Sequence, residues 1–282
     1  HVPLPSKRLR HLGGLMAITT LDGLIAGLKP PQALHKVGAA MEAAGVFHTW
    51  WYTAGRPGVA TANAAGVNGR AVTPSLVTGE IDRTNPVAQN AHLARLDARA
   101  SVVGTLMLVD RLWENSGLST TLTTSQAIAP AAIPSRDLNG AALGHGVQAA
   151  MEWSAAGGAG VPTVTLTYTD QDGNTGNSGT FVGVATPVAG TIEMFSLAAG
   201  DSGVRAPTAY IQSATRTSGT MHLILYRVLA TIGVSLANAA FSLDAITSGM
   251  PRVYDDSVLQ LIWLASATTA VNFTGLYIEA QG

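Results

Sequence analysis

The chain has 282 residues, of which 47% are hydrophobic and 12% are charged, with no cysteine and a net charge of −1. Globular domains carry about 25% charged residues, so we expect other protein subunits to cover much of this surface. The absence of cysteine excludes disulfides and thiolate metal sites. The uncharged run Ser257 to Ile278 contains polar residues throughout, which indicates paired strands and not a membrane span.

Charge is distributed unevenly along the chain. Residues 1–100 hold ten Lys or Arg against five Asp or Glu, whereas residues 101–282 hold six against twelve. The asymmetry is either chance or the mark of a basic N-terminal part that docks on an acidic neighbour. The basic residues are scattered and form no stripe with interleaved aromatic residues, so we predict no nucleic-acid partner and no membrane partner.

The first residue of the chain is His and not Met. A basic cluster follows it, formed by Lys7, Arg8 and Arg10. Met16, followed by Ala-Ile-Thr-Thr, has the form of a native start. We therefore interpret residues 1–15 as an extension upstream of that start. The cluster lacks the apolar segment of a secretory signal.

Two short helices are predicted next. Thr20 is a suitable N-cap, and the apolar residues of segment 21–28 lie on one helical face before Pro30. Pro31 suits the first turn of a second helix, which would end at Gly45.

A strand and a long irregular segment follow. The aromatic and β-branched run Val46 to Thr53 predicts a strand. Residues 54–86 are rich in Gly, Ala, Asn and Pro, which indicates an extended arm or a long loop. Residues 16–90 are thus expected to form an N-terminal region of helices, strand and extended arm.

Beyond residue 90, strand and turn signals recur at intervals typical of β-sandwiches. In residues 163–169, Thr alternates with Val, Leu and Tyr, which indicates a sheet with one buried face. We predict a mainly β fold, with a jelly-roll-like two-sheet β-sandwich over residues 91–282 and an immunoglobulin-like sandwich as the alternative. The expected strands are His92–Ala98, Thr105–Trp113, Gly146–Ser154, Thr163–Thr169, Gly179–Val184, Gly190–Ser196, Ala206–Ser213, His222–Ala230 and two within Val258–Ala280.

Two motifs typical of enzymes or metal sites are incomplete. Residues 200–203 (Gly-Asp-Ser-Gly) resemble the surroundings of a serine-protease nucleophile, but the supporting His context and flanking cysteines are missing, so we predict a tight turn. Residues 170–174 (Asp-Gln-Asp-Gly-Asn) resemble the first half of a calcium loop. Thr175 and Phe181 stand where that loop needs Gly and Glu, so we expect a solvated turn, with a looser calcium site as the alternative.

Other candidates for catalysis are isolated. The histidines show no metal-ligand spacing. Glu152 and Glu193 would be a carboxylate pair for glycoside hydrolysis only if the fold brought them together, and no further residue supports that reading. We therefore predict that the chain is not an enzyme and has no catalytic residue, cofactor or metal site.

The segment Leu106 to Gly117 (LMLVDRLWENSG) is unusual because it places charges inside an apolar strand. Alternation puts Asp110 on one face and both Arg111 and Trp113 on the other. The segment is either an edge strand with outward charges or a subunit contact, since Arg and Trp are enriched at interfaces.

Four segments resemble structural proteins of tailed bacteriophages. The resemblance covers most of residues 16–282 and implies a virion component without catalytic residues, several such proteins being head decoration or cement proteins. The segments are MAITTLDGLIAGLKPPQ from Met16, DRLWENSGL from Asp110, GVRAPTAYIQSATRTSGTMHLILYRVLA from Gly203 and GMPRVYDDSVLQLIWLASATTA from Gly249.

We accordingly expect a virion protein on the capsid exterior that binds the major capsid protein and stabilises the shell as a homo-oligomer, a trimer. Residues 16–86 would extend across adjacent capsid subunits. Aromatic and Arg side chains dominate interface energies. The anchors expected on that basis are Trp50, Trp51, Tyr52, Arg56, Arg111 and Trp113.

The alternative is a head-fibre or tail protein whose sandwich binds bacterial glycans. Trp113, Trp153, Trp263 and Tyr210 are the aromatic residues that would stack on sugars. A hydrolase on the same scaffold has no coherent set of residues behind it.

Overall fold

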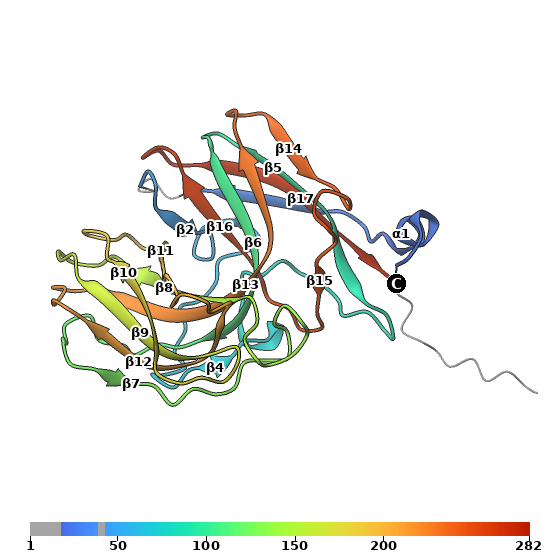
Figure 1. Cartoon of the computed structure of the whole chain (residues 1–282). Coiled ribbons are helices and arrows are strands. Elements are labelled where there is room, and N and C mark those ends of the chain that lie inside the picture. The colour runs from blue at the N-terminus through green and yellow to red at the C-terminus, as the bar shows by residue number, and fades with distance from the viewer. Residues whose placement is uncertain (1–17, 39–42) are drawn as a thin grey trace, which may run out of the picture.

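The computed structural model describes residues 18–38 and 43–282 as three antiparallel β-sheets and one short α-helix (Figure 1). The prediction of a mainly β chain with a short helical N-terminal region is confirmed. The extension at 1–15, the start at Met16 and residues 39–42 of the predicted second helix lie outside the described residues. In the described ranges, no helix is both long and apolar enough to span a bilayer.

The first sheet, here called the β5 sheet, has the order β14-β5-β17-β1-β3, with β15 also paired to β5. Within β5, exposed Arg95 and Arg99 alternate with buried Leu96 and Ala98, so one face points into the protein. The strands are β1 (Gln32–Val37), β3 (Gly55–Arg56), β5 (Ala91–Ala100), β14 (Ala240–Leu243), β15 (Arg252–Val253) and β17 (Asn272–Gln281).

The second sheet, the β9 sheet, has the order β10-β9-β12-β7. Val164, Leu166 and Tyr168 of β9 are buried, which confirms the predicted alternation. The turn predicted at residues 170–174 is also confirmed, because the Gly173 N–H donates to the carbonyl of Asp170 at 3.2 Å and the chain then returns as β10, paired with β9. The strands are β7 (Gln126–Ala127), β9 (Thr163–Asp170), β10 (Asn177–Val182) and β12 (Val204–Gln212).

The third sheet, the central sheet, closes on itself. Strand β13 pairs with β8 on one side and β6 on the other, so six strands form a barrel-like ring in the order β13-β8-β11-β2-β16-β6, and β4 adds to β6. The strands are β2 (Phe47–Thr49), β4 (Arg70–Ala71), β6 (Gly104–Glu114), β8 (Val147–Ala155), β11 (Thr191–Met194), β13 (Thr220–Val234) and β16 (Leu259–Ala265).

The outer face of the ring packs against both other sheets. One part joins the β5 sheet in a core that includes Leu108, Trp263 and Phe273. Another part joins the β9 sheet in a core that includes Met151 and Leu166. Strands β6 and β13 are long enough to cross from one core to the other, as Figure 1 shows. The molecule is therefore two sandwiches that share the central sheet.

The N-terminal region confirms one predicted helix and corrects the other. Helix α1 (Leu21–Gly27) begins at Thr20, whose hydroxyl accepts the Gly23 N–H at 3.0 Å. The predicted second helix is wrong, because residues 32–37 form β1 and pair with β17 along six residues. Pairing with a central strand outweighs the weak local preference for helix.

The predicted arm lies along its own chain. Ala60, Val72 and Ile81 are buried, and the N–H groups of Val72 and Ile81 donate to carbonyls of β6 and β16. A 3-10 turn, η1 (Pro74–Leu76), lies within this segment. Strands β1 and β2, which precede residue 90, are internal strands of two sheets.

Candidate functional site

Strand β6 turns two consecutive charged residues to opposite sides of the central sheet. Opposite β13, Leu225 pairs with Trp113 and Tyr226 pairs with Arg111, so Leu112 is an extra residue in a β-bulge. The bulge aims Arg111 into the ring and Trp113 toward the β9 sheet. The prediction that these two side chains share a face is therefore wrong. The edge-strand prediction is also wrong, since β6 pairs on both sides.

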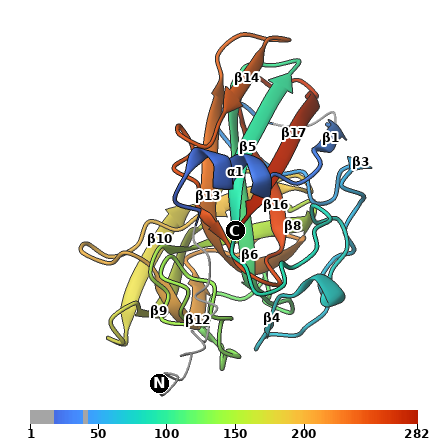
Figure 2. The same cartoon turned by 90° about the vertical axis from the view of Figure 1, so that its right-hand side faces the viewer.

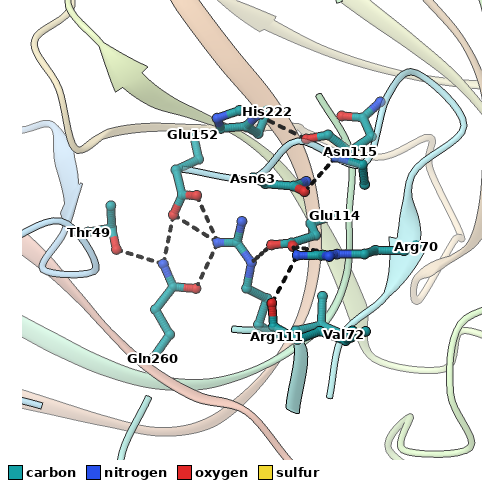
Figure 3. A network of polar contacts seen from close by, with 12 residues as sticks. Thr49, Asn63, Arg70, Val72, Arg111, Glu114, Asn115, Glu152, His222 and Gln260 are labelled. Carbon is teal, nitrogen blue, oxygen red and sulfur yellow. Dashed lines mark hydrogen bonds and ion pairs between the residues drawn. The ribbon is translucent and has the colours of Figure 1, made fainter. Parts of the chain in front are cut away.

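Inside the ring, Arg111 is the centre of a buried ion-pair network (Figure 3). Its Nη1 donates to Oε1 and Oε2 of Glu152 at 2.9 and 2.8 Å, and its Nε donates to Oε2 of Glu114 at 2.9 Å. Arg70 reaches Oε1 of Glu114 through Nε and Nη2 at 3.1 and 2.8 Å. Two guanidinium groups thus balance two carboxylates.

Neutral side chains complete this network. Gln260 accepts from Arg111 at 3.2 Å and donates to Glu152 at 2.8 Å and to the hydroxyl of Thr49 at 2.6 Å. The Tyr52 hydroxyl donates to Glu152 at 3.0 Å. The network therefore joins β6, β8 and β16 with β2 and the residues that follow it.

The electrostatic environment of the network keeps Arg111 charged and Tyr52 neutral. Burial alone lowers the pKa of Arg111, but the carboxylates of Glu152 and Glu114 outweigh it and raise that pKa above its usual value. Burial, together with the charge of Glu152, raises the pKa of Tyr52, so the phenol stays protonated. These buried, ion-paired groups stabilise the strand arrangement and offer no exposed acid or base to a substrate, although Nη2 of Arg111 is buried without a hydrogen-bond partner from the described part of the chain.

The carboxylate pair imagined for glycoside hydrolysis does not form. Glu152 points into the ring, whereas Glu193 faces the opposite side of the central sheet, where it accepts from Trp153 Nε1 at 2.8 Å and from Arg216 at 3.3 Å. In a glycoside hydrolase, retaining or inverting, the two catalytic carboxylates must face each other across one cleft. The sheet itself separates these two groups.

Asp110 organises a second buried cluster, outside the ring. Its carboxylate accepts from the Ser257 hydroxyl at 2.7 Å and lies 3.4 Å from Arg136 Nε and 3.6 Å from Arg227 Nη2. Arg136 also donates to the carbonyl of Val72 at 2.9 Å. Burial lowers the pKa of both arginines, and Asp110 partly offsets that effect. This cluster thus binds the segment 55–81 at Val72.

Most of the six anchors expected from the sequence are inside the folded chain. Trp50 stacks on Trp263 at 5.4 Å between ring centroids, and Trp51 lies under the Arg111 guanidinium. Arg111 and Trp113 have no exposed surface, and Tyr52 is half-buried. Of the six, Arg56 in β3 alone is classed as exposed.

The aromatic residues of the glycan-binding alternative are buried as well. Trp113, Trp153, Trp263 and Tyr210 all have 0% exposure. A stacking platform needs an accessible ring face, so these four residues cannot supply one in this structure. They fill the two cores instead.

The calcium-loop-like segment 170–174 and the protease-like segment 200–203 are both turns whose polar groups form local hydrogen bonds. The Asp170 carboxylate accepts the N–H groups of Asp172 and Asn174 and the side-chain amides of Asn174 and Asn177. Segment 200–203 is a turn, in which Ser202 and Gly203 donate their N–H groups to Gln171. In the part of the chain that the structure describes, no three His, Asp or Glu side chains gather as metal ligands.

The surface is poorer in charge than the composition suggests. Twelve of the 33 charged residues of the chain are buried within the described ranges. Large apolar side chains such as Val87 and Ile246 are exposed by 90% and 89%. Sequence reasoning pointed to a covered surface, but the burial of so many charges could not be read from composition.

A groove with a volume of about 1070 Å³ lies beside the free part of β1. Three segments line it, residues 29–34, residues 56–58 and residues 80–87, together with the end of β17. Pro31, Ala33 and Val87 contribute exposed apolar surface, and Arg83 is held in the wall by Glu279 at 2.8 Å. No local sequence pattern marks this groove, because the segments that line it are distant in the chain.

Comparison with known proteins gives no family assignment. No family model and no curated protein matches the chain. A structure of infectious bursal disease virus, Gt strain, matches 90% of this chain and 82% of its own at 9% identity, with a TM-score of 0.16. The infectious bursal disease virus VP2 subviral particle matches 89% of this chain and 42% of its own at 10% identity, with a TM-score of 0.12. Similarities at these TM-scores support no conclusion about fold or function.

Proposed function

We propose that this chain is a structural protein of a tailed-bacteriophage virion, which binds the major capsid protein on the capsid exterior and stabilises the shell as a decoration or cement protein. The proposal includes self-association into a small homo-oligomer, a trimer. Its support is the resemblance of four segments to phage structural proteins, taken together with the charge-poor surface.

The observation that carries the proposal is the burial of charge. Charged groups normally stay in water, and a surface depleted of them resembles the core of a protein interface. Here ion pairs inside the ring and around Asp110 withdraw arginines and carboxylates from the surface. What remains outside includes exposed Leu, Ile and Val side chains, which a protein in a permanent assembly can cover.

The structure changes how such a protein would contact the shell. Residues 55–81 are bound to the body, so a long arm across neighbouring subunits is not available without breaking the Asp110 cluster. The contact surface is instead expected on the body of the folded chain. The buried networks keep that body rigid, which suits a protein that must hold two shell subunits at a fixed spacing.

The test uses phage shells that lack the protein. Purified protein is mixed with these shells, and binding is measured by co-sedimentation and located by cryo-electron microscopy. We expect saturable binding with ordered density on the capsid exterior and a higher temperature of shell disruption. Density at the tail alone, or no binding to shells, overturns the proposal.

A further inference from the structure

Helix α1 packs on β17 through Gly27 and leaves an apolar stripe uncovered on its other side. Leu21, Ile25 and Leu28 are spaced as one stripe and are exposed by 70%, 59% and 46%. In Figure 1 the helix stands off the body beyond the end of β17, and in Figure 2 it faces the viewer with no described segment in front of it. A helix of seven residues has little stability alone in water, and its contact with β17 leaves the three apolar side chains of the stripe exposed.

The attachment of α1 is short and lies next to the groove. Leu28 forms a bridge with Ala280, and the Lys29 N–H donates to the carbonyl of Glu279 at 2.8 Å. Lys29 and the two prolines after it then form part of the groove wall. The chain thus presents an apolar helix and an open groove side by side, and its own helix does not fill its own groove.

The groove has the right size and charge for such a helix. A seven-residue helix is about 10 Å long and about 10 Å in diameter, or on the order of 800 Å³, against a groove of about 1070 Å³. The segment carries Asp22 at its start and Lys29 just after its end. The groove offers Arg56 on one segment and Glu80 on another, and neither side chain has an ion-pair partner among the described residues.

We propose that α1 of one copy of this chain docks in the groove beside β1 of a second copy, with its apolar stripe against the exposed Pro31, Ala33 and Val87 of that copy. Asp22 then faces Arg56 of the second copy, and Lys29 faces Glu80, whose Oε2 is buried without a hydrogen bond. Repetition of this contact closes a ring or a reciprocal pair. This contact supplies the self-association in the proposed function and rests on that part of it.

Cysteine cross-linking tests the contact directly, because the chain has no cysteine of its own. Two single variants, Ile25→Cys and Val87→Cys, are mixed in a 1:1 ratio under mild oxidation. We expect a disulfide between the two different chains, identified by mass spectrometry. A mixture of Ile25→Cys with Ile246→Cys is the control, since Ile246 is exposed but lies outside the groove. Cross-linking that is no greater than in the control overturns the proposal.

A second measurement uses the full chain without cysteine. Ile25→Asp places a charge on the stripe, and we expect its self-association in sedimentation velocity to be at least tenfold weaker than that of the wild type. Ile246→Asp introduces the same change at an exposed site away from the groove and should leave self-association within twofold. Both sites are exposed, so thermal unfolding should be unchanged in each variant.

The outcomes separate this contact from shell binding. A wild-type chain that is monomeric at all concentrations overturns the docking of α1, even if it binds shells. An oligomer that depends on Ile25 but does not bind shells supports the docking and overturns the capsid role. An oligomer that Ile25→Asp leaves intact overturns the docking.

Discussion

Arg111 and Glu152, which are 41 residues apart, meet inside the ring with one guanidinium nitrogen bound to both carboxylate oxygens at 2.8 and 2.9 Å. Neither side chain is exposed to solvent. A buried charge is tolerated only when its partner and hydrogen bonds are in place. The strands β6 and β8 are not paired with each other, so this ion pair links two strands across the interior of the ring.

The first prediction concerns this pair. Glu152→Gln keeps the shape of the side chain but leaves Arg111 with part of its charge uncompensated, and we expect a loss of about 3 to 5 kcal/mol in the free energy of unfolding. Chemical denaturation measures it. Arg70→Gln is the control, because the Arg70 side chain is 34% exposed and its removal should cost at most about 1 kcal/mol. A smaller loss for Glu152→Gln than for Arg70→Gln contradicts the role of the buried pair.

The local sequence pattern is sufficient to predict a strand where one face of that strand is buried and the other is exposed. The alternation of Thr163–Asp170 identified β9, its inward side chains and the turn after it. It failed for residues 31–45, where Leu34 and the residues after it fit a helix as well as a strand. The choice there depends on β17, which pairs with β1 from more than 230 residues away, and no local pattern contains that partner.

The site was less predictable than the fold. Charges inside the apolar segment 106–117 were a real signal, but their interpretation required the bulge at Leu112 and the partners on β8 and β16. Aromatic residues were assigned to interfaces because they are enriched there. Large aromatic side chains also fill cores, and only the packing of two sheets decides which role Trp113 or Trp263 takes.

The second prediction concerns Asp137, whose buried carboxylate organises a loop. Its two oxygens accept five backbone N–H groups, those of Asn139, Ala141, Leu143, Gly144 and His145, at 2.8 to 3.3 Å. Asp137→Ala leaves these donors without an acceptor, so we expect a loss of about 2 to 4 kcal/mol in the free energy of unfolding. Asp172→Ala, at an exposed turn, should cost less than about 1 kcal/mol in the same denaturation experiment. Equal losses would refute the prediction.

The third prediction is a pH dependence from His48. Its ring is buried, Nε2 accepts the Ala43 N–H at 3.0 Å, and burial lowers its pKa to about 4. The unfolded chain has a His pKa of about 6.5 and therefore binds more protons between pH 6.5 and 4. Stability is complete above pH 6.5 and falls as the pH is lowered through this window, by at most about 3 kcal/mol from this group.

Unfolding free energies measured at pH 7.5 and 5 check this expectation. We expect the difference between the two pH values to shrink in His48→Gln. It should not vanish, because burial also lowers the pKa of His222. His35→Gln is the control, since His35 is exposed on β1 and should leave the difference unchanged. A His48→Gln variant with the full wild-type pH dependence would assign the effect to other groups.

The fourth prediction concerns the attachment of α1 to β17. A Cβ on Gly27 would lie 2.4 Å from the carbonyl oxygen of Gln281, so Gly27→Ala must push the helix away from the strand. We expect faster hydrogen exchange at the amides of residues 24–29 and weaker self-association, because α1 then leaves its fixed position beside the groove. The unfolding free energy of the body should change by less than about 1 kcal/mol, since α1 packs on few buried groups.

Gly23→Ala is the matched control for this change. Its added Cβ meets only the Thr20 hydroxyl at 3.1 Å, a side chain that can move, and Ala favours helix over Gly by about 1 kcal/mol. Exchange in α1 should therefore stay the same or become slower, and self-association should be preserved. If both alanine variants behave alike, the close approach of Gly27 to β17 does not set the position of the helix. If Gly27→Ala alone loosens the helix yet self-association is unchanged, the helix is attached as described but is not the element that joins two copies.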